Sequence, residues 1–148
     1  MRYASINFND ITAAPGLCVT VFLQGCPHHC PGCHNPTTWD FNGGEEFTAE
    51  TMTAIIEGLN AQNIQRNLCI MGGEPLCPNN RFLVLLLMNS VLEKLPDTKI
   101  YIWTGYTYEE LERDGFIETY TGKGSFVKAQ NPEFLKEENL RQIEKLLS

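Results

Sequence analysis

The sequence predicts an α/β fold in which crossover helices connect the strands of a parallel sheet. Short β-branched and apolar runs alternate three times with longer segments of helical periodicity, an order typical of parallel sheets. The length of 148 residues matches one compact domain, so a single domain over residues 1–148 is expected. Each predicted strand also runs into glycine, at the sheet edge where parallel α/β folds bind their ligands.

The first predicted strand covers residues 17–25 (LCVTVFLQG), a short apolar and β-branched run that ends at Gly25. A helix is expected over residues 47–63, because Thr48 can cap its start and Thr51 follows three positions later. The apolar residues that then fall at helical spacing are Met52, Ile55, Ile56 and Leu59.

Strands and helices continue to alternate beyond this helix. A strand is predicted over residues 67–75, and a largely buried helix that ends at Pro96 over residues 79–96. A further strand is predicted over residues 98–106, followed by a helix over residues 107–114 that Thr107 can cap. Beyond Asp114 the pattern weakens. It favours a fourth strand over residues 116–121 and a terminal helix over residues 132–148.

Composition and charge argue against several classes of protein. The net charge is −7 and the pI is near 4.9, unlike proteins that present a basic face to nucleic-acid phosphates. The first ten residues lack the apolar region of a signal peptide. The longest apolar run, Phe82–Met88, is far too short to cross a bilayer. We therefore expect a soluble, cytoplasmic protein with no nucleic-acid or membrane partner.

Three of the six cysteines lie together, in a C-x3-C-x2-C pattern formed by Cys26, Cys30 and Cys33. A disulfide framework suits short secreted chains, whereas clustered cysteines in a cytosolic chain more often bind metal. Cys18 and Cys69 lie in apolar runs, where a free cysteine behaves as a small hydrophobic residue. The clustered cysteines therefore predict a metal site in the loop after the first strand.

Two kinds of metal site are compatible with three clustered cysteines. The loop could hold three irons of a [4Fe–4S] cluster and leave the fourth iron open to a small molecule. An open coordination position of this kind is typical of a catalytic metal site rather than a structural one. Alternatively, His28, His29 or His34 could supply the fourth ligand of a structural zinc site. The spacing alone leaves both alternatives open.

The motifs together resemble a known superfamily. A C-x3-C-x2-C loop directly after a first strand, with Gly-Gly-Glu-Pro after a second, resembles the radical S-adenosylmethionine superfamily. Within it, the stretches APGLCVTVFLQGCPHHCPGCHNPTTWDFNGGEEFT, MGGEPL and WTGYTYEEL are similar to the activating proteins of anaerobic ribonucleotide reductase, which are glycyl radical enzyme activases. The resemblance extends from Ala14 to Leu111.

The resemblance implies a fold and a metal centre. The fold would be a partial, abbreviated parallel β/α barrel of the radical S-adenosylmethionine type. The metal centre would be a [4Fe–4S] cluster with one open iron, held by Cys26, Cys30 and Cys33. The amino and carboxylate groups of S-adenosylmethionine would bind the open iron.

The resemblance also implies which residues bind S-adenosylmethionine: His34, Gly72, Gly73, Glu74 and Pro75. The last four match the segment that meets the methionine amino group, where glycines allow close approach and carbonyl oxygens accept from an ammonium. Glu74 could accept as well, and an ordinary loop carboxylate is the alternative. At His34 the backbone, rather than the imidazole, is expected to contact adenine. No catalytic residue beyond the cluster and the cofactor is implied.

The function implied is the generation of a glycyl radical on anaerobic ribonucleotide reductase through a 5′-deoxyadenosyl radical, with an electron donor such as a flavodoxin. One alternative is activation of another glycyl radical enzyme, or a radical S-adenosylmethionine reaction on a small molecule. The alternative that is not an enzyme is an interaction module stabilised by zinc.

Overall fold

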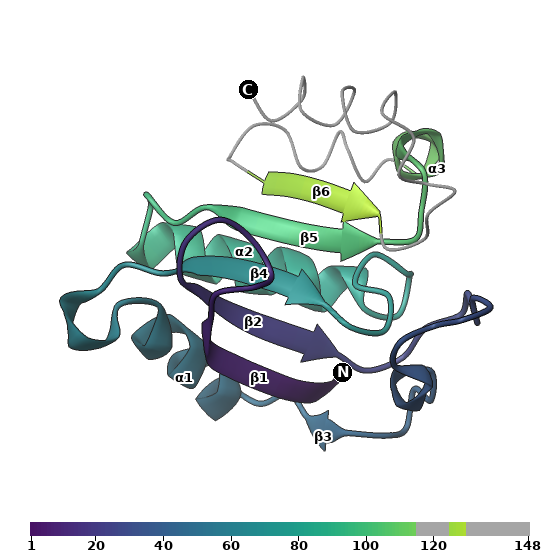
Figure 1. The fold of residues 1–148 in the computed structure, drawn as a ribbon, viewed down its shortest axis with the longest axis horizontal. Helices are drawn as coiled ribbons and strands as arrows, with labels where there is room; N and C mark the ends of the chain where they lie inside the picture. Colours follow the sequence, from purple (N-terminus) through teal and green to yellow (C-terminus); the bar gives the residue numbers. More distant parts are fainter. Residues whose placement is uncertain (115–124, 130–148) are drawn as a thin grey trace.

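The computed structural model describes residues 1–114 and 125–129, which form one six-stranded sheet with helices packed on it (Figure 1). The strands are β1 (Arg2–Asp10), β2 (Cys18–Leu23), β3 (Glu45–Glu46), β4 (Asn67–Met71), β5 (Ile100–Thr104) and β6 (Ser125–Ala129). The α-helices are α1 (Ala49–Leu59), α2 (Arg81–Lys94) and α3 (Tyr108–Arg113), and the 3-10 helices are η1 (Pro36–Thr38) and η2 (Ala61–Asn63). The strand order across the sheet is β3-β1-β2-β4-β5-β6.

The sheet is mixed, so the predicted partial parallel β/α barrel is wrong. Strands β2, β4, β5 and β6 are parallel, whereas β1 is antiparallel to β2 and β3 is antiparallel to β1. The physical reason lies in the seven residues from Ile11 to Leu17 that join β1 to β2. A parallel crossover needs a dozen residues or more, so this connection can only reverse the chain. Within the described residues the sheet is open, with β3 and β6 at its edges.

Most of the other predicted elements are confirmed with shorter bounds. The strands expected over residues 17–25, 67–75 and 98–106 are β2, β4 and β5, and the three expected helices are α1, α2 and α3. Thr48 and Thr107 cap α1 and α3 as expected, each in a reciprocal capping box. The strand predicted over residues 116–121 and the terminal helix predicted over residues 132–148 lie outside the described residues.

Alternation along the parallel strands gives the sheet two different faces. Val19 lies beside Leu68, which lies beside Ile100, and this aliphatic row packs with buried residues of α1 and α2. On the opposite face Thr20 lies beside Cys69, which lies beside Tyr101. Helices α1 and α2 pack on the aliphatic face (Figure 1), while Thr20 and Cys69 on the opposite face are also fully buried.

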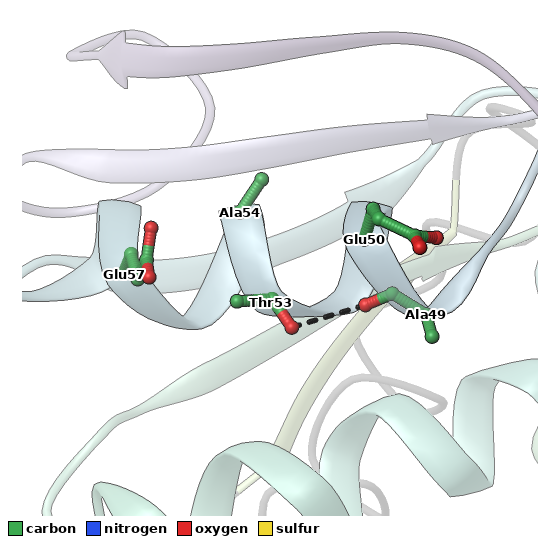
Figure 2. A pocket seen from close by; sticks show the side chains of 5 residues that line it. All are labelled: Ala49, Glu50, Thr53, Ala54 and Glu57. Atoms are coloured by element: carbon green, nitrogen blue, oxygen red, sulfur yellow. Dashed lines mark hydrogen bonds between the residues drawn. The ribbon is translucent and has the colours of Figure 1, made fainter.

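A shallow hollow of about 270 Å³ lies on the exposed side of α1 (Figure 2). It is lined by Ala49, Glu50, Thr53, Ala54 and Glu57. None of these is a predicted site residue, so the hollow is separate from the strand ends that carry the predicted motifs. No helix in the described part of the chain has the length and apolar content needed to cross a membrane.

Candidate functional site

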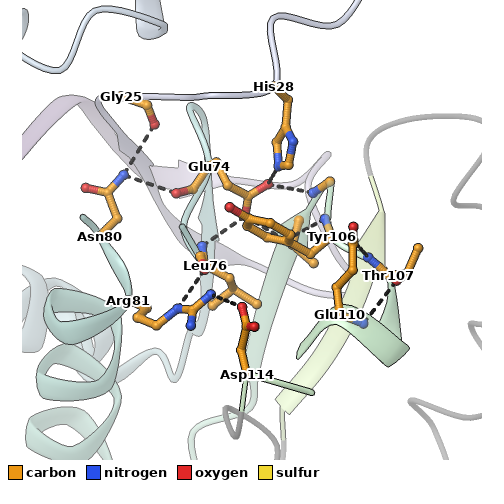
Figure 3. A network of polar contacts seen from close by, with 12 residues as sticks. Gly25, His28, Glu74, Leu76, Asn80, Arg81, Tyr106, Thr107, Glu110 and Asp114 are labelled. Carbon is orange, nitrogen blue, oxygen red and sulfur yellow. Dashed lines mark hydrogen bonds and ion pairs between the residues drawn. The ribbon is translucent and has the colours of Figure 1, made fainter. Parts of the chain in front are cut away.

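Three neighbouring strand ends meet at one edge of the sheet. Strands β2, β4 and β5 are adjacent and parallel, so the segments that follow them emerge side by side (Figure 3). These segments are the cysteine loop (residues 25–35), the GGEP turn (residues 72–75) and Gly105–Tyr106. The predicted convergence of the three segments at the carboxyl edge of the sheet is therefore confirmed.

The start of the cysteine loop is fixed by the backbone. The N–H of Gly25 donates to the carbonyl oxygen of Thr38 at 2.7 Å, and the N–H of Cys26 donates to that of Trp39 at 3.2 Å. Gly25 has a φ of +99°, and a Cβ at this position would collide with the ring of Phe41. A glycine is therefore required where β2 passes into the loop.

The three cysteines of the loop differ in exposure. Cys26 is buried, and its burial raises the pKa of its thiol, whereas Cys30 and Cys33 are half-buried. In residues 1–114 and 125–129 no three Cys, His, Asp or Glu side chains lie close enough together to hold a metal ion. The three thiols thus share one short loop without converging. As a donor set they fit an iron–sulfur cluster, because thiolates are the ligands that such clusters take.

The GGEP turn touches the cysteine loop directly. The N–H of Glu74 donates to the carbonyl oxygen of Gly25 at 2.8 Å. Gly73 has a φ of +49°, and a Cβ there would lie 2.5 Å from the same oxygen. At Gly72, with a φ of +67°, a Cβ would crowd Phe22. Gly73 thus allows the turn to contact the cysteine loop, and Gly72 allows the turn to lie against Phe22 in β2.

The Glu74 carboxylate is buried and accepts hydrogen bonds from several parts of the chain (Figure 3). Its Oε1 accepts from the N–H of Leu76 at 2.9 Å and from Oγ1 of Thr104 at 2.6 Å. Its Oε2 accepts from the N–H of Gly105 at 2.7 Å and lies 2.9 Å from Nε2 of His28. The hydrogen bond with Glu74 is the main cause that raises the pKa of His28. The carboxylate therefore joins the cysteine loop to the end of β5.

Comparisons with known proteins show the family to which the chain belongs. A family model described as a 4Fe-4S single cluster domain matches residues 13–140. An anaerobic ribonucleoside-triphosphate reductase-activating protein of Salmonella typhi is 41% identical over 112 residues, which are 75% of this chain and 73% of that protein. A protein of the same name from Escherichia coli K12 is 41% identical over 112 residues, which are 75% of this chain and 73% of that protein. Another from Enterobacteria phage T4 is 36% identical over 113 residues, which are 76% of this chain and 72% of that protein. The chain belongs to this activating-protein family. The resemblance drawn from the sequence is thereby confirmed.

The two remaining predicted site residues, His34 and Pro75, differ in burial, and Cys77 and Trp39 lie beside the site without having been predicted as part of it. His34 is exposed in the cysteine loop, while Pro75 is buried in the GGEP turn. Cys77 is buried as well, which raises the pKa of its thiol, and its N–H donates to the carbonyl oxygen of Glu74 at 3.4 Å. Trp39 stacks on His29 with ring centroids 4.5 Å apart, so it lies directly against the loop.

Sequence reasoning did not assign a role to Asn80 or Thr104, which hold the site together. Asn80 is buried, and its Nδ2 lies 3.1–3.3 Å from the carbonyl oxygens of Gln24, Gly25 and Glu74. Figure 3 shows the contacts with Gly25 and Glu74. In the sequence Asn80 stands just before α2, where it resembles an ordinary helix cap, yet its side chain makes no capping hydrogen bond. Its distance in sequence from Gly25, and not its residue type, conceals this role.

Proposed function

We propose that the chain activates anaerobic ribonucleotide reductase by generating a glycyl radical on it, with a [4Fe–4S] cluster and S-adenosylmethionine as cofactors. The names of its relatives support the choice of partner, and the matching family model supports the cluster. The single observation that carries the proposal is the contact between the cysteine loop and the GGEP turn, made by the hydrogen bond from the N–H of Glu74 to Gly25.

Cys26, Cys30 and Cys33 would hold the cluster, leaving one iron without a protein ligand. The backbone around Gly72 and Gly73 would accept from the methionine ammonium, because these half-buried glycines have no side chain to block its approach. Pro75 would shape the turn, and the backbone at His34 would contact adenine.

When bound, the cluster and S-adenosylmethionine would supply a one-electron cleavage of the sulfonium to methionine and a 5′-deoxyadenosyl radical, the species that could take a hydrogen atom from a glycine of the reductase. The electron would come from an external donor such as a flavodoxin. The residues of this chain would bind the two groups and orient them at the sheet edge.

The proposal is tested by electron paramagnetic resonance. The anaerobically reconstituted and reduced protein is mixed with S-adenosylmethionine and an anaerobic ribonucleotide reductase, and a glycyl radical signal is expected on the reductase. A reductase variant with alanine in place of the radical glycine serves as the control. The absence of any signal with a fully loaded cluster would reject the proposal, and a signal only with a different glycyl radical enzyme would favour the alternative partner.

Metal analysis separates the enzyme from the interaction module stabilised by zinc. After anaerobic purification, about four irons and four sulfides per chain are expected. One zinc ion per chain without iron would instead favour a structural site.

A further inference from the structure

His28 lies at the centre of the spacing between Cys26 and Cys30, and its ring is enclosed by residues from other segments. Its Nε2 lies 2.9 Å from Oε2 of Glu74, and the His28 side chain is 23% exposed. Its ring meets that of Tyr106 edge to face, with centroids 4.7 Å apart. A Cβ at Gly105 would lie 2.9 Å from the ring, so this glycine makes room for it. His28 is thus packed into the site rather than extended into solvent.

The hydrogen bond has a defined direction. A buried carboxylate that already accepts from three other donors can only accept from the imidazole, so Nε2 of His28 carries the proton and donates it. The hydrogen bond is therefore assisted by the charge of Glu74, and such bonds are about twice as strong as neutral ones.

Glu74 itself is held in place independently of His28. Three of its four hydrogen bonds come from Leu76, Thr104 and Gly105, which belong to the segment after the GGEP turn and to the end of β5. Its side chain is only 2% exposed. The carboxylate is consequently a rigid anchor, and the cysteine loop is the part that gains a position from the contact.

The cysteine loop needs such an anchor. Backbone hydrogen bonds fix its beginning at Gly25 and Cys26, and within the loop the N–H of Cys33 donates locally to the carbonyl oxygen of Cys30. His28 connects the segment between the first two cysteines to the ends of β4 and β5 through its side chain.

We propose that His28 is a positioning residue that fixes the Cys26–Cys30 segment relative to the Gly72–Gly73 backbone through its hydrogen bond to Glu74. This inference rests on the proposed function, because the distance that it fixes is the distance between the cluster ligands and the peptide groups that would receive the methionine ammonium. His28 does not need to touch either cofactor. Its role is to keep the two halves of the cofactor site in register.

The test compares His28→Ala, His28→Gln, Glu74→Gln and the double variant His28→Ala/Glu74→Gln with the wild type. His29→Asn is the matched control: it changes the adjacent histidine, whose ring contacts Trp39, and asparagine tolerates the positive φ of 48° at that position. Three properties are measured for each protein. They are the iron and sulfide content, the S-adenosylmethionine titration of the reduced cluster by electron paramagnetic resonance, and the steady-state kinetics of S-adenosylmethionine cleavage, resolved into KM and kcat.

We expect His28→Ala to keep its cluster and to raise both the Kd and the KM for S-adenosylmethionine about tenfold, the factor typical of losing one hydrogen bond to a charged group. The turnover number should change much less. His28→Gln, whose amide can still donate to Glu74, should recover most of the affinity. In the double variant the two losses should not add, because His28 acts through Glu74. Unchanged affinity in His28→Ala, or additive losses, would overturn the inference.

A measurement on the cluster-free protein keeps this inference separate from the proposed function. Cys26 is 8% exposed, so iodoacetamide should alkylate it slowly under reducing conditions. Release of His28 should raise the rate of alkylation about tenfold, as the loop opens more often. An unchanged rate in His28→Ala would reject positioning whether or not the protein activates a reductase, whereas failure of the wild type to cleave S-adenosylmethionine would reject only the proposed function.

Discussion

At Gly73 the backbone has a φ of +49°, and a Cβ would lie 2.5 Å from the carbonyl oxygen of Gly25. Gly32 in the cysteine loop also has a positive φ, of +73°, but a Cβ there would meet no atom within 4 Å. The two glycines therefore share the conformational requirement and differ in the space around them.

We expect Gly32→Ala to lower the free energy of unfolding by about 1–2 kcal/mol, the cost of placing a side chain in the left-handed region. Gly73→Ala should lose about 1–3 kcal/mol more, because the GGEP turn must also move away from the cysteine loop. Urea denaturation of the two cluster-free variants measures the difference. Equal losses would show that the contact between the turn and the loop contributes nothing to stability.

A second prediction at this scale separates the cysteines. Replacing Cys26, Cys30 or Cys33 by Ala should abolish cluster binding, since two thiolates cannot hold the cube. Cys18→Ala or Cys69→Ala should leave the iron content unchanged and cost about 1–2 kcal/mol of stability, because both residues are fully buried. Iron and sulfide analysis after anaerobic reconstitution distinguishes the two groups of variants. An intact, active cluster in any of the three loop variants would contradict the assignment of the ligands.

At the scale of elements, the turn between β1 and β2 depends on Asp10, which is buried at the end of β1. Its Oδ1 accepts from the N–H and Oγ1 of Thr12, and its Oδ2 accepts from Oγ1 of Thr20, each at 2.8 Å. Burial alone would raise the pKa of Asp10, but these hydrogen bonds outweigh burial and hold the pKa below its usual value. The Asp10 carboxylate thus connects the end of β1 and the turn that follows it with β2.

This pKa shift predicts how stability changes with pH. A folded-state pKa below the unfolded value gives stability that is fully present above about pH 4 and is lost as the pH falls through the folded pKa. Asp10→Asn should therefore be less stable than the wild type by about 1–3 kcal/mol at pH 7. The difference should shrink below about pH 4. Urea denaturation from about pH 7 down to about pH 2.5 measures it, with the exposed Asp97→Asn as control. A constant difference across this range would argue against the ionised carboxylate as the cause.

The strands that could be predicted from the sequence are those with both an apolar, β-branched composition and a glycine near their end. Strands β2, β4 and β5 are apolar, β-branched runs that end near glycine, and capping threonines mark α1 and α3. By contrast, β1 (RYASINFND) lacks a continuous apolar run and is largely exposed or half-buried. Ala4, Ile6 and Phe8 alternate with Ser5, Asn7 and Asn9, a pattern typical of a strand that the prediction above did not use. Its antiparallel pairing with β2 follows from the short connection, which becomes visible only once β1 is recognised as a strand.

The site was predictable in its motifs but not in its connections. The cysteine loop and the GGEP turn are each contiguous in sequence, and a resemblance to known motifs points to them. The hydrogen bonds of Glu74 to His28 and Thr104 span 46 and 30 residues. Such pairs are brought together by the register of β2, β4 and β5, which no local pattern of residues encodes.

At the scale of the whole molecule, the open sheet has a consequence for activity. Among the described residues the sheet ends at β3 and β6 and does not close into a barrel, so its strands do not surround the carboxyl edge that carries the cysteine loop. In the proposed reaction a 5′-deoxyadenosyl radical would attack nearly any C–H bond near it, so the site would need a closing wall when the radical forms. A segment of the reductase that carries its glycine could provide that wall, since glycine has no side chain to block its approach.

We therefore expect the reduced protein alone to cleave S-adenosylmethionine slowly, and the rate to rise at least about tenfold when the reductase is added. Formation of 5′-deoxyadenosine with and without the reductase measures this, with an unrelated protein of similar size as control. Equally fast cleavage in both mixtures would show that the activating protein closes its own site.

The anchoring of Glu74 also limits how far the cysteine motif can be separated from its fold. A peptide of residues 25–35 would contain all three thiols, yet the groups that define their surroundings come from elsewhere: Thr38 and Trp39 fix its start, and Glu74 receives His28. Glu74 in turn depends on Thr104 and Gly105 at the end of β5. For protein design, the smallest transplantable unit is therefore three adjacent parallel strand ends with their loops, because a cysteine motif grafted alone would carry the three thiols and leave behind the GGEP turn and the strand ends that hold it in position.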